Sequence, residues 1–348
     1  ANTFLAASLT KEEHAAIRER AGLFDVSHMG RVAVRGGGAE AFLQKLTSND
    51  LARLPPGSGQ YTLALNEAGG VRDDLIIFRL EGEWLVVVNA GNRDKIAAHF
   101  RAHAGTGVEL ADRSDELAMI ALQGPRAAAV LGSLDAAAPR LERFRIARFR
   151  VAGEELWVSR TGYTGEDGFE LYPAAARAAA VWDALLAAGA ADRVAACGLG
   201  ARDALRLEVC YPLYGHELDE TTTPWEARLG WVVKLDKGEF LGRAALARAR
   251  EQGPARRLVG FTCAGPVPRQ GCALTLGGAP AGMVTSGGYS PCLKTGIGLG
   301  YLPRAPEPGE ALAVVVRGRP VPVVPVAPPF YGGGSLERAP KGATNGTG

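Results

Sequence analysis

The stretch Tyr61-Thr-Leu-Ala-Leu-Asn-Glu-Ala-Gly-Gly-Val-Arg-Asp-Asp-Leu-Ile-Ile-Phe78 decides the fold class. Its two apolar ends flank a glycine pair, which is the pattern of a β-hairpin. A third apolar run, Trp84 to Val88, follows after the short turn at residues 81–83. Connections this short join antiparallel strands, because parallel strands need a crossover of a dozen or more residues. The pattern favours an α+β fold with antiparallel sheets over a doubly wound parallel sheet.

Similar units recur on both sides of this hairpin. Strands are expected at residues 31–35, 117–122, 149–151, 155–159 and 169–172, and helices at 39–46, 174–188, 201–208 and from a cap at Asn92 to about 103. From about Arg256, short β-branched runs at 258–262, 283–285, 311–316 and 321–326 alternate with Pro and Gly, which is typical of a small barrel or sandwich. We therefore predict an α+β region over 1–255, an all-β region over 256–331 and a disordered tail over 332–348.

Composition excludes several classes of protein. The chain has 348 residues, enough for about two domains by length alone, and its 39 Lys+Arg against 37 Asp+Glu leave a net charge of +2. That balance argues against a broad basic surface for nucleic acid. No run of 18 apolar residues is present, so no membrane span is expected, and the start shows no basic and apolar pattern of a signal peptide.

The cysteines and histidines indicate neither a disulfide framework nor a metal site. The five Cys are odd in number and widely spaced, which fits a reducing compartment such as a bacterial cytoplasm or mitochondrial matrix. His99 and His103 are four apart on an expected helix, but no third ligand follows at a useful spacing. We therefore expect no metal.

The first candidate site is the carboxylate pair Asp73-Asp74 at the start of an apolar strand. Neighbouring side chains on a strand point to opposite faces, so one carboxylate can face solvent while the other faces a cavity. The alternative is a turn in which an Asp accepts backbone N–H groups.

Two further polar segments are candidates. The loop Arg160-Thr-Gly-Tyr-Thr-Gly-Glu-Asp-Gly-Phe-Glu170 holds three glycines and three carboxylates, which suits a ligand with N–H donors, although an acidic surface loop fits as well. It matches no phosphate-binding motif. Arg202 and Arg206 share one face of a helix, for which a solvated face is the default expectation.

Together these segments resemble one family, the aminomethyltransferase or T-protein of the glycine cleavage system. The collinear motifs that carry the resemblance are Phe24-Asp-Val-Ser-His-Met-Gly30, Asn66-Glu-Ala-Gly-Gly-Val-Arg-Asp-Asp74, Val87-Val-Asn89, the loop 160–170, Leu199-Gly-Ala-Arg-Asp203, Leu205-Arg-Leu-Glu208, Tyr214-Gly-His-Glu-Leu218 and Trp231-Val-Val-Lys-Leu-Asp236. They extend over roughly residues 10–331.

The resemblance implies a three-lobed cloverleaf, with two interleaved antiparallel α+β lobes, a C-terminal β-barrel and tetrahydrofolate in the central hole. It implies an enzyme that takes the aminomethyl group from the lipoyl arm of the H-protein, releases ammonia and forms 5,10-methylene-tetrahydrofolate. The implied state is a cytoplasmic or mitochondrial monomer that meets lipoylated H-protein transiently, with tetrahydrofolate as co-substrate and no metal.

Residue roles follow from the resemblance, position by position. Asp74 matches the catalytic aspartate, Glu170 the acid that holds the pterin, and Arg202 the folate-binding arginine. The other implied folate contacts are Met29, Tyr61, Val87, Asn89, Tyr163 and, in the diverged tail, Tyr331. Arg72 stands where the family tends to be apolar.

Three alternatives share this fold. A folate-dependent O-, S- or N-demethylase would keep Glu170 and Arg202, but the Asp74 and Gly-His-Glu-Leu segments speak against it. A non-catalytic folate-binding protein of iron–sulfur maintenance resembles a K-G-C-Y-x-G-Q loop, whereas this chain has Lys237-Gly-Glu-Phe-Leu-Gly242 without Cys. A fragment of a flavin amine oxidase would need a dinucleotide-binding half that is not present.

Overall fold

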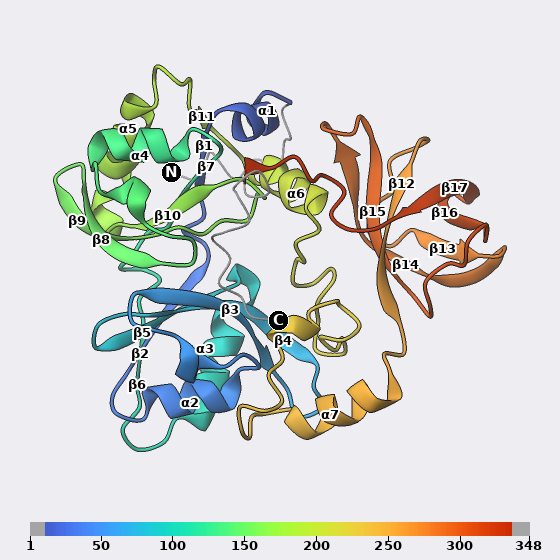
Figure 1. Ribbon diagram of the computed structural model, residues 1–348, viewed down its shortest axis with the longest axis horizontal. Coiled ribbons are helices and arrows are strands. Elements are labelled where there is room, and N and C mark those ends of the chain that lie inside the picture. Colours follow the sequence, from blue (N-terminus) through green and yellow to red (C-terminus); the bar gives the residue numbers. More distant parts are fainter. Residues whose placement is uncertain (1–10, 336–348) are drawn as a thin grey trace.

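The computed structural model describes residues 11–335 of the chain. Figure 1 shows three bodies arranged in a ring, two built on sheets and the third a barrel. We name them the first lobe, the second lobe and the barrel, and their strands pair as two open sheets and one closed barrel. The predicted three-lobed α+β fold is confirmed.

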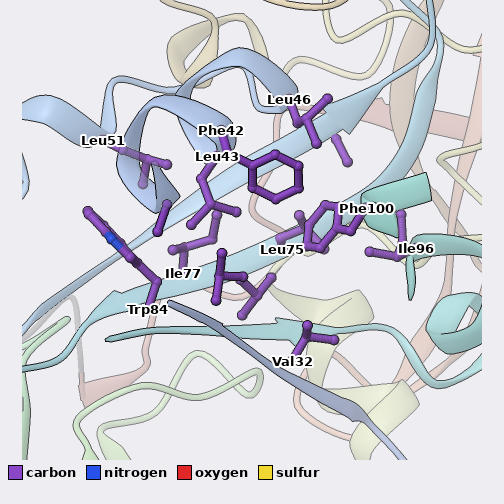
Figure 2. Packing of buried hydrophobic residues seen from close by; sticks show 14 of the residues in the cluster. Val32, Phe42, Leu43, Leu46, Leu51, Leu75, Ile77, Trp84, Ile96 and Phe100 are labelled. Carbon is purple, nitrogen blue, oxygen red and sulfur yellow. The ribbon is translucent and has the colours of Figure 1, made fainter. Parts of the chain in front are cut away.

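The first lobe is an antiparallel sheet covered by helices. In spatial order its strands are β3 (Ser58–Leu65), β4 (Val71–Arg79), β5 (Glu83–Val88), β2 (Gly30–Arg35) and β6 (Glu109–Asp112). The predicted hairpin forms between β3 and β4, with Thr62 opposite Leu75. Two helices, α2 (Ala39–Leu46) and α3 (Arg93–His103), pack on the sheet. Between them Phe42 meets Phe100 edge to face at 5.5 Å, which closes the core shown in Figure 2.

The second lobe is interleaved with the first. In spatial order its strands are β11 (Ala195–Ala196), β1 (Gly22–Asp25), β7 (Ile120–Gln123), β10 (Gly168–Tyr172), β9 (Glu154–Ser159) and β8 (Ile146–Val151). Thus β1 precedes every strand of the first lobe in sequence, yet it pairs with β7 and β11, which follow them. The helices of this region are α1 (Lys11–Glu19), α4 (Ala127–Leu134), α5 (Ala178–Ala188) and α6 (Leu199–Glu208).

The barrel closes through six strands within the described residues. In order around it they are β12 (Arg257–Cys263), β15 (Thr295–Leu302), β14 (Ala279–Ser290), β13 (Ala273–Leu276), β16 (Leu312–Val316) and β17 (Arg319–Val326). The sequence pattern missed β13 and β15. In β15 every second residue from 296 to 300 is glycine, which hides the strand, but a Cβ at Gly298 would lie 2.4 Å from the ring of Phe261. The glycines therefore make room for the barrel's interior.

Two segments join the barrel to the lobes and complete the ring. The helix α7 (Arg243–Gln252) leads into β12, and the chain after β17 returns to the second lobe. There the backbone N–H of Tyr331 donates to the carbonyl of Glu208 at 2.9 Å. Most of the tail predicted to be disordered, residues 336–348, lies outside the described residues; Ser335 is described and its hydroxyl donates to Glu166 at 2.7 Å.

Candidate functional site

One cavity of about 980 Å³ lies where the three bodies meet. All nine residues for which the sequence predicted a catalytic or folate-binding role line it: Met29, Tyr61, Asp74, Val87, Asn89, Tyr163, Glu170, Arg202 and Tyr331. They come from strands of both sheets, from the loops that follow β1, β5 and β9, from α6 and from the segment after the barrel. The fold therefore brings together residues up to 302 positions apart (331 − 29 = 302), around a space of the size that small-molecule sites occupy.

Asp74 forms the acidic wall of the cavity on the side of the first lobe. Its carboxylate accepts a hydrogen bond from the hydroxyl of Tyr61 at 3.1 Å and from the side-chain amide of Asn89 at 2.6 Å. Burial raises the pKa of Asp74 to about 6, although both hydrogen bonds oppose the shift. No arginine or lysine in the described part of the chain forms an ion pair with this carboxylate. Asp74 can therefore exchange a proton near neutral pH.

Asp73 departs from expectation, because neither member of the pair faces solvent. The Asp73 side chain is 0% exposed and accepts from the side-chain amides of Asn89 at 2.8 Å and Asn92 at 2.5 Å. Burial and the neighbouring Asp74 raise the pKa of Asp73 to about 7. Asn92, expected to cap α3 with its side chain, makes no such cap and serves this carboxylate instead. The start of α3 thus covers the face of β4 that we expected to be open.

Glu170 and Arg202 form the opposite, second-lobe end of the cavity. The carboxylate of Glu170 is 4% exposed and accepts from the hydroxyl of Thr161 at 2.5 Å, and burial raises its pKa. The guanidinium of Arg202 lies over the ring of Tyr163 at 4.6 Å. Its Nη1 is buried and has no hydrogen-bond partner in the structure as described, residues 11–335. Buried donors are nearly always satisfied, so this one is available to an acceptor atom in the cavity.

Arg206, four residues after Arg202, corrects the default expectation of a solvated face. It is 1% exposed, pairs with Glu217 at 2.9 Å and donates to the hydroxyl of Ser286 on β14 at 2.8 Å. Arg206 therefore joins α6 to the barrel, and of these two arginines only Arg202 leaves a buried donor unmatched.

A buried polar cluster beside Tyr331 was missed by the sequence reasoning. Glu208 on α6 accepts from Arg18 at 2.8 Å, from His14 at 2.9 Å and from Ser290 at 2.6 Å. Burial alone would raise the pKa of Glu208, but His14 and Arg18 lower it to about 2. Arg18 also lies 4.5 Å from the ring centre of Tyr331. The only signal in the sequence was the four-residue spacing of His14 and Arg18 on one helix.

Neither histidine group is arranged as a metal centre. Among the described residues, His14, Glu208 and Cys292 offer ligand atoms within 4.8 Å of one another. However, the guanidinium of Arg18 binds the same carboxylate oxygen of Glu208 as His14, so a cation there would face a fixed positive charge. The histidines His99 and His103, for which the sequence offered no third ligand, also have an arginine beside them, Arg72.

Arg72 lies next to His99 and shapes its titration. Its Nη1 lies 3.4 Å from Nδ1 of His99, and burial together with the charge of Arg72 lowers the pKa of His99 to about 4. Glu220 lies 3.9 Å from the same guanidinium. The arginine found where the family tends to be apolar thus has polar neighbours, His99 and Glu220.

Comparison with known proteins is consistent with this geometry. The family model "GCVT N-terminal domain" matches residues 2–237, and "Glycine cleavage T-protein C-terminal barrel domain" matches residues 256–332. The aminomethyltransferase of Geobacillus kaustophilus is 50% identical over 337 residues, covering 93% of this chain and 91% of that protein. The aminomethyltransferase of Thermus thermophilus is 48% identical over 322 residues, covering 92% and 89%.

A solved structure agrees with the sequence relatives. The glycine cleavage system aminomethyltransferase T from Bartonella henselae superposes with a TM-score of 0.85 at 34% identity, covering 93% of this chain and 90% of that one. Fold, cavity and relatives together define the class, which is a transferase enzyme. The chain belongs to the glycine cleavage T-protein family, as the resemblance implied, and its activity is that of an aminomethyltransferase.

Proposed function

We propose that this chain transfers the C1 unit of an aminomethyl-lipoyl arm, carried by the H-protein, to tetrahydrofolate. The products are ammonia, 5,10-methylene-tetrahydrofolate and the dihydrolipoyl arm. The observation that carries the proposal is the cavity in which Asp74, Glu170 and Arg202 meet, in a chain whose relatives at about half identity are named aminomethyltransferases. Those names do not favour the demethylase or the iron–sulfur alternative.

The second-lobe end of the cavity suits the pterin of tetrahydrofolate. A carboxylate such as Glu170 accepts from the two-donor edge formed by the 2-amino group and ring N–H. The unmatched Nη1 of Arg202 supplies a donor for a carbonyl or carboxylate oxygen of the same molecule. Met29 and Val87 add apolar wall, and Tyr163 holds Arg202 by stacking. The residues present therefore fit a folate.

Asp74 is placed for the proton transfers that the reaction requires. The methylene carbon loses its bonds to the amino nitrogen and to the lipoyl sulfur, and it forms bonds to two folate nitrogens. Each of those nitrogens loses one proton, and the ammonia and the thiol that leave each gain one. A carboxyl whose pKa is about 6 can accept and return such protons near neutral pH, and its ionised form stabilises the positive charge of an iminium-like intermediate.

We further propose that the chain acts as a monomer in the cytoplasm of a bacterium and meets lipoylated H-protein only transiently. Its relatives named above come from bacteria. No helix in the described part of the chain is long and apolar enough to cross a membrane. Size-exclusion chromatography with and without H-protein tests the oligomeric state directly.

The decisive experiment measures release of ammonia and formation of methylene-tetrahydrofolate from aminomethylated H-protein. Asp74→Asn should lower turnover by about 10²-fold, the contribution of a positioned acid–base group, while the Kd for tetrahydrofolate changes little. Glu170→Gln is the matched variant, because it also neutralises one enclosed carboxylate, and it should raise the Kd. The dissociation constants are measured by fluorescence titration.

Each result can contradict a different part of the proposal. An Asp74→Asn enzyme with unchanged turnover would remove Asp74 from the proton transfers. Unchanged tetrahydrofolate binding by Glu170→Gln would show that the pterin lies elsewhere. If the parent enzyme releases no ammonia but demethylates a small donor, the demethylase reading is correct instead.

A further inference from the structure

Trp231 combines high exposure with a fixed position at the cavity. It lies in the short 3-10 helix η6 (Gly230–Val232), lines the cavity and leaves 61% of its side chain exposed. A single exposed apolar side chain is ordinary on a protein surface, so the contacts of Trp231 at the cavity decide whether it has a role.

The backbone around Trp231 is held firmly to the first lobe. The carbonyl of Val232 accepts from the hydroxyl of Ser48 at 2.9 Å, and the N–H of Lys234 donates to the carbonyl of Ser48 at 2.9 Å. The side chains of Val232 and Val233 are buried in the cluster that also contains Leu63. The exposure of the indole therefore arises from its fixed position and does not come from a loose segment.

The indole packs directly against a residue that holds Asp74. The rings of Trp231 and Tyr61 are stacked, with centroids 5.9 Å apart and planes 21° from parallel. The hydroxyl of Tyr61 donates to Asp74 at 3.1 Å. Tyr61 lies on β3 and packs against the buried cluster that contains Leu63, and the stacked indole is a further contact that limits rotation of the phenol ring.

We infer that Trp231 is a positioning residue that acts on Asp74 through Tyr61. By fixing the plane of the phenol ring, the indole keeps the hydroxyl aimed at the carboxylate. The inference rests on the proposed function, because it requires that Asp74 takes part in the reaction. It makes the pH dependence of turnover sensitive to a residue that does not touch Asp74.

The other groups that face Asp74 are independent of Trp231. Asp73 lies beside it on β4, Glu217 faces it from the segment after α6, and Tyr163 faces it from the loop 160–170. Asp73 and Glu217 oppose ionisation of Asp74, and donation by Tyr61 favours it. Tyr61 is the hydrogen-bond partner of Asp74 that the indole contacts, and loss of its donation should move the pKa of Asp74 upward.

The experiment compares Trp231→Leu with the parent enzyme in the assay with aminomethylated H-protein and tetrahydrofolate. We expect kcat to fall about threefold to tenfold, the contribution of an aromatic pair, while KM for tetrahydrofolate changes less than twofold. The acidic limb of the kcat profile should move upward by about half a pH unit. Trp231→Phe retains a stacking ring and should restore both quantities. Trp231→Gln removes the ring without adding apolar surface and should repeat the leucine result.

Two controls separate this inference from simpler explanations. Tyr289→Leu changes an exposed aromatic of the barrel that does not line the cavity, and it should leave the acidic limb in place. The double variant Tyr61→Phe with Trp231→Leu should be no slower than Tyr61→Phe alone, because both changes act on one contact.

The outcomes are distinguishable. An acidic limb that stays in place in Trp231→Leu, or additive losses in the double variant, would overturn the positioning role. A raised KM with unchanged kcat would also overturn it and would make Trp231 a substrate contact. If Asp74→Asn itself keeps full turnover, the proposed function of Asp74 has failed, and the inference fails with it.

Discussion

Asp74 and Glu208 are two enclosed carboxylates in one molecule, and their surroundings are opposite. Glu208 receives Arg18, His14 and a serine hydroxyl, and its pKa falls to about 2. Asp74 receives a phenol and an amide, both neutral, and its pKa rises to about 6. Burial pushes the pKa of both groups upward, so the presence or absence of a cation decides the direction.

The difference separates a structural acid from a reactive one. Glu208 stays ionised at any physiological pH, and it ties α1 and α6 to the barrel. Asp74 has a proton affinity close to the surrounding pH, which a group that moves protons needs. The role of a titratable group next to the cavity can therefore be inferred only when the charges of its hydrogen-bond partners are known.

The largest expected effect comes from Glu208→Gln, which should remove about 3 kcal/mol from the free energy of unfolding near pH 7. The cost arises because the buried guanidinium of Arg18 and the ring of His14 lose this carboxylate as a partner, although Arg18 keeps Glu166. The native carboxylate titrates near 2 and the unfolded one near 4.5, so its contribution is complete above pH 4.5 and disappears as the pH falls toward 2. Urea unfolding at several pH values measures this; a loss that is equal at pH 7 and pH 3 would contradict it.

Asp74→Asn should have a smaller effect on stability, with the opposite pH dependence. The folded pKa of Asp74 is above its ordinary value of 3.8, so the folded state binds the proton more tightly, and stability falls as the pH rises from about 4 to about 6. The Asp74→Asn variant has no carboxyl to titrate here, so its stability does not fall in this way as the pH rises. Relative to the parent, its free energy of unfolding should therefore rise by about 2–3 kcal/mol between pH 4 and pH 8. A difference that is constant over this range would show that Asp74 titrates normally.

The smallest and sharpest test removes one hydroxyl donor from each acid. Tyr61→Phe should move the acidic limb of turnover upward by about half a pH unit to one unit, because the ionised form of Asp74 loses a donor. Ser290→Ala removes a donor from Glu208 and should cost about 1 kcal/mol of stability, leaving the limb unchanged. If the acidic limb of turnover moved equally in both variants, Asp74 and Glu208 would not differ in their part in the reaction.

The local sequence pattern was sufficient where a single segment carries the information. The hairpin around Gly69-Gly70 and the helix α2 follow from alternation and apolar spacing, and both form as predicted. The family motifs placed nine residues at one cavity, although their roles in folate binding and catalysis remain predictions. The domain limits at 255 and 331 also remain predictions.

The rest depended on contacts between distant segments. Nothing local shows that His14 and Arg18 meet a glutamate 194 and 190 residues further on. The burial of Asp73 depends on α3, and the burial of Arg206 depends on β14. The strand β15 was hidden because its glycines are chosen for the side chains packed across the barrel. Tertiary packing overrode local propensity at each of these positions.

The interleaved connection also fixes an order of assembly on the ribosome. The strands of the first lobe, β2 to β6, form one continuous insert, and their pairing with one another can begin as soon as they have emerged. The short apolar strand β1 is made before that insert, but its partners β7 and β11 emerge about 100 and 170 residues later (120 − 22 = 98; 195 − 22 = 173). The nascent chain must therefore keep Leu23 and Phe24 unpaired while a neighbouring sheet with open edges forms. Correct folding of the ring therefore requires that β1 stays unpaired until β7 and β11 have been synthesised.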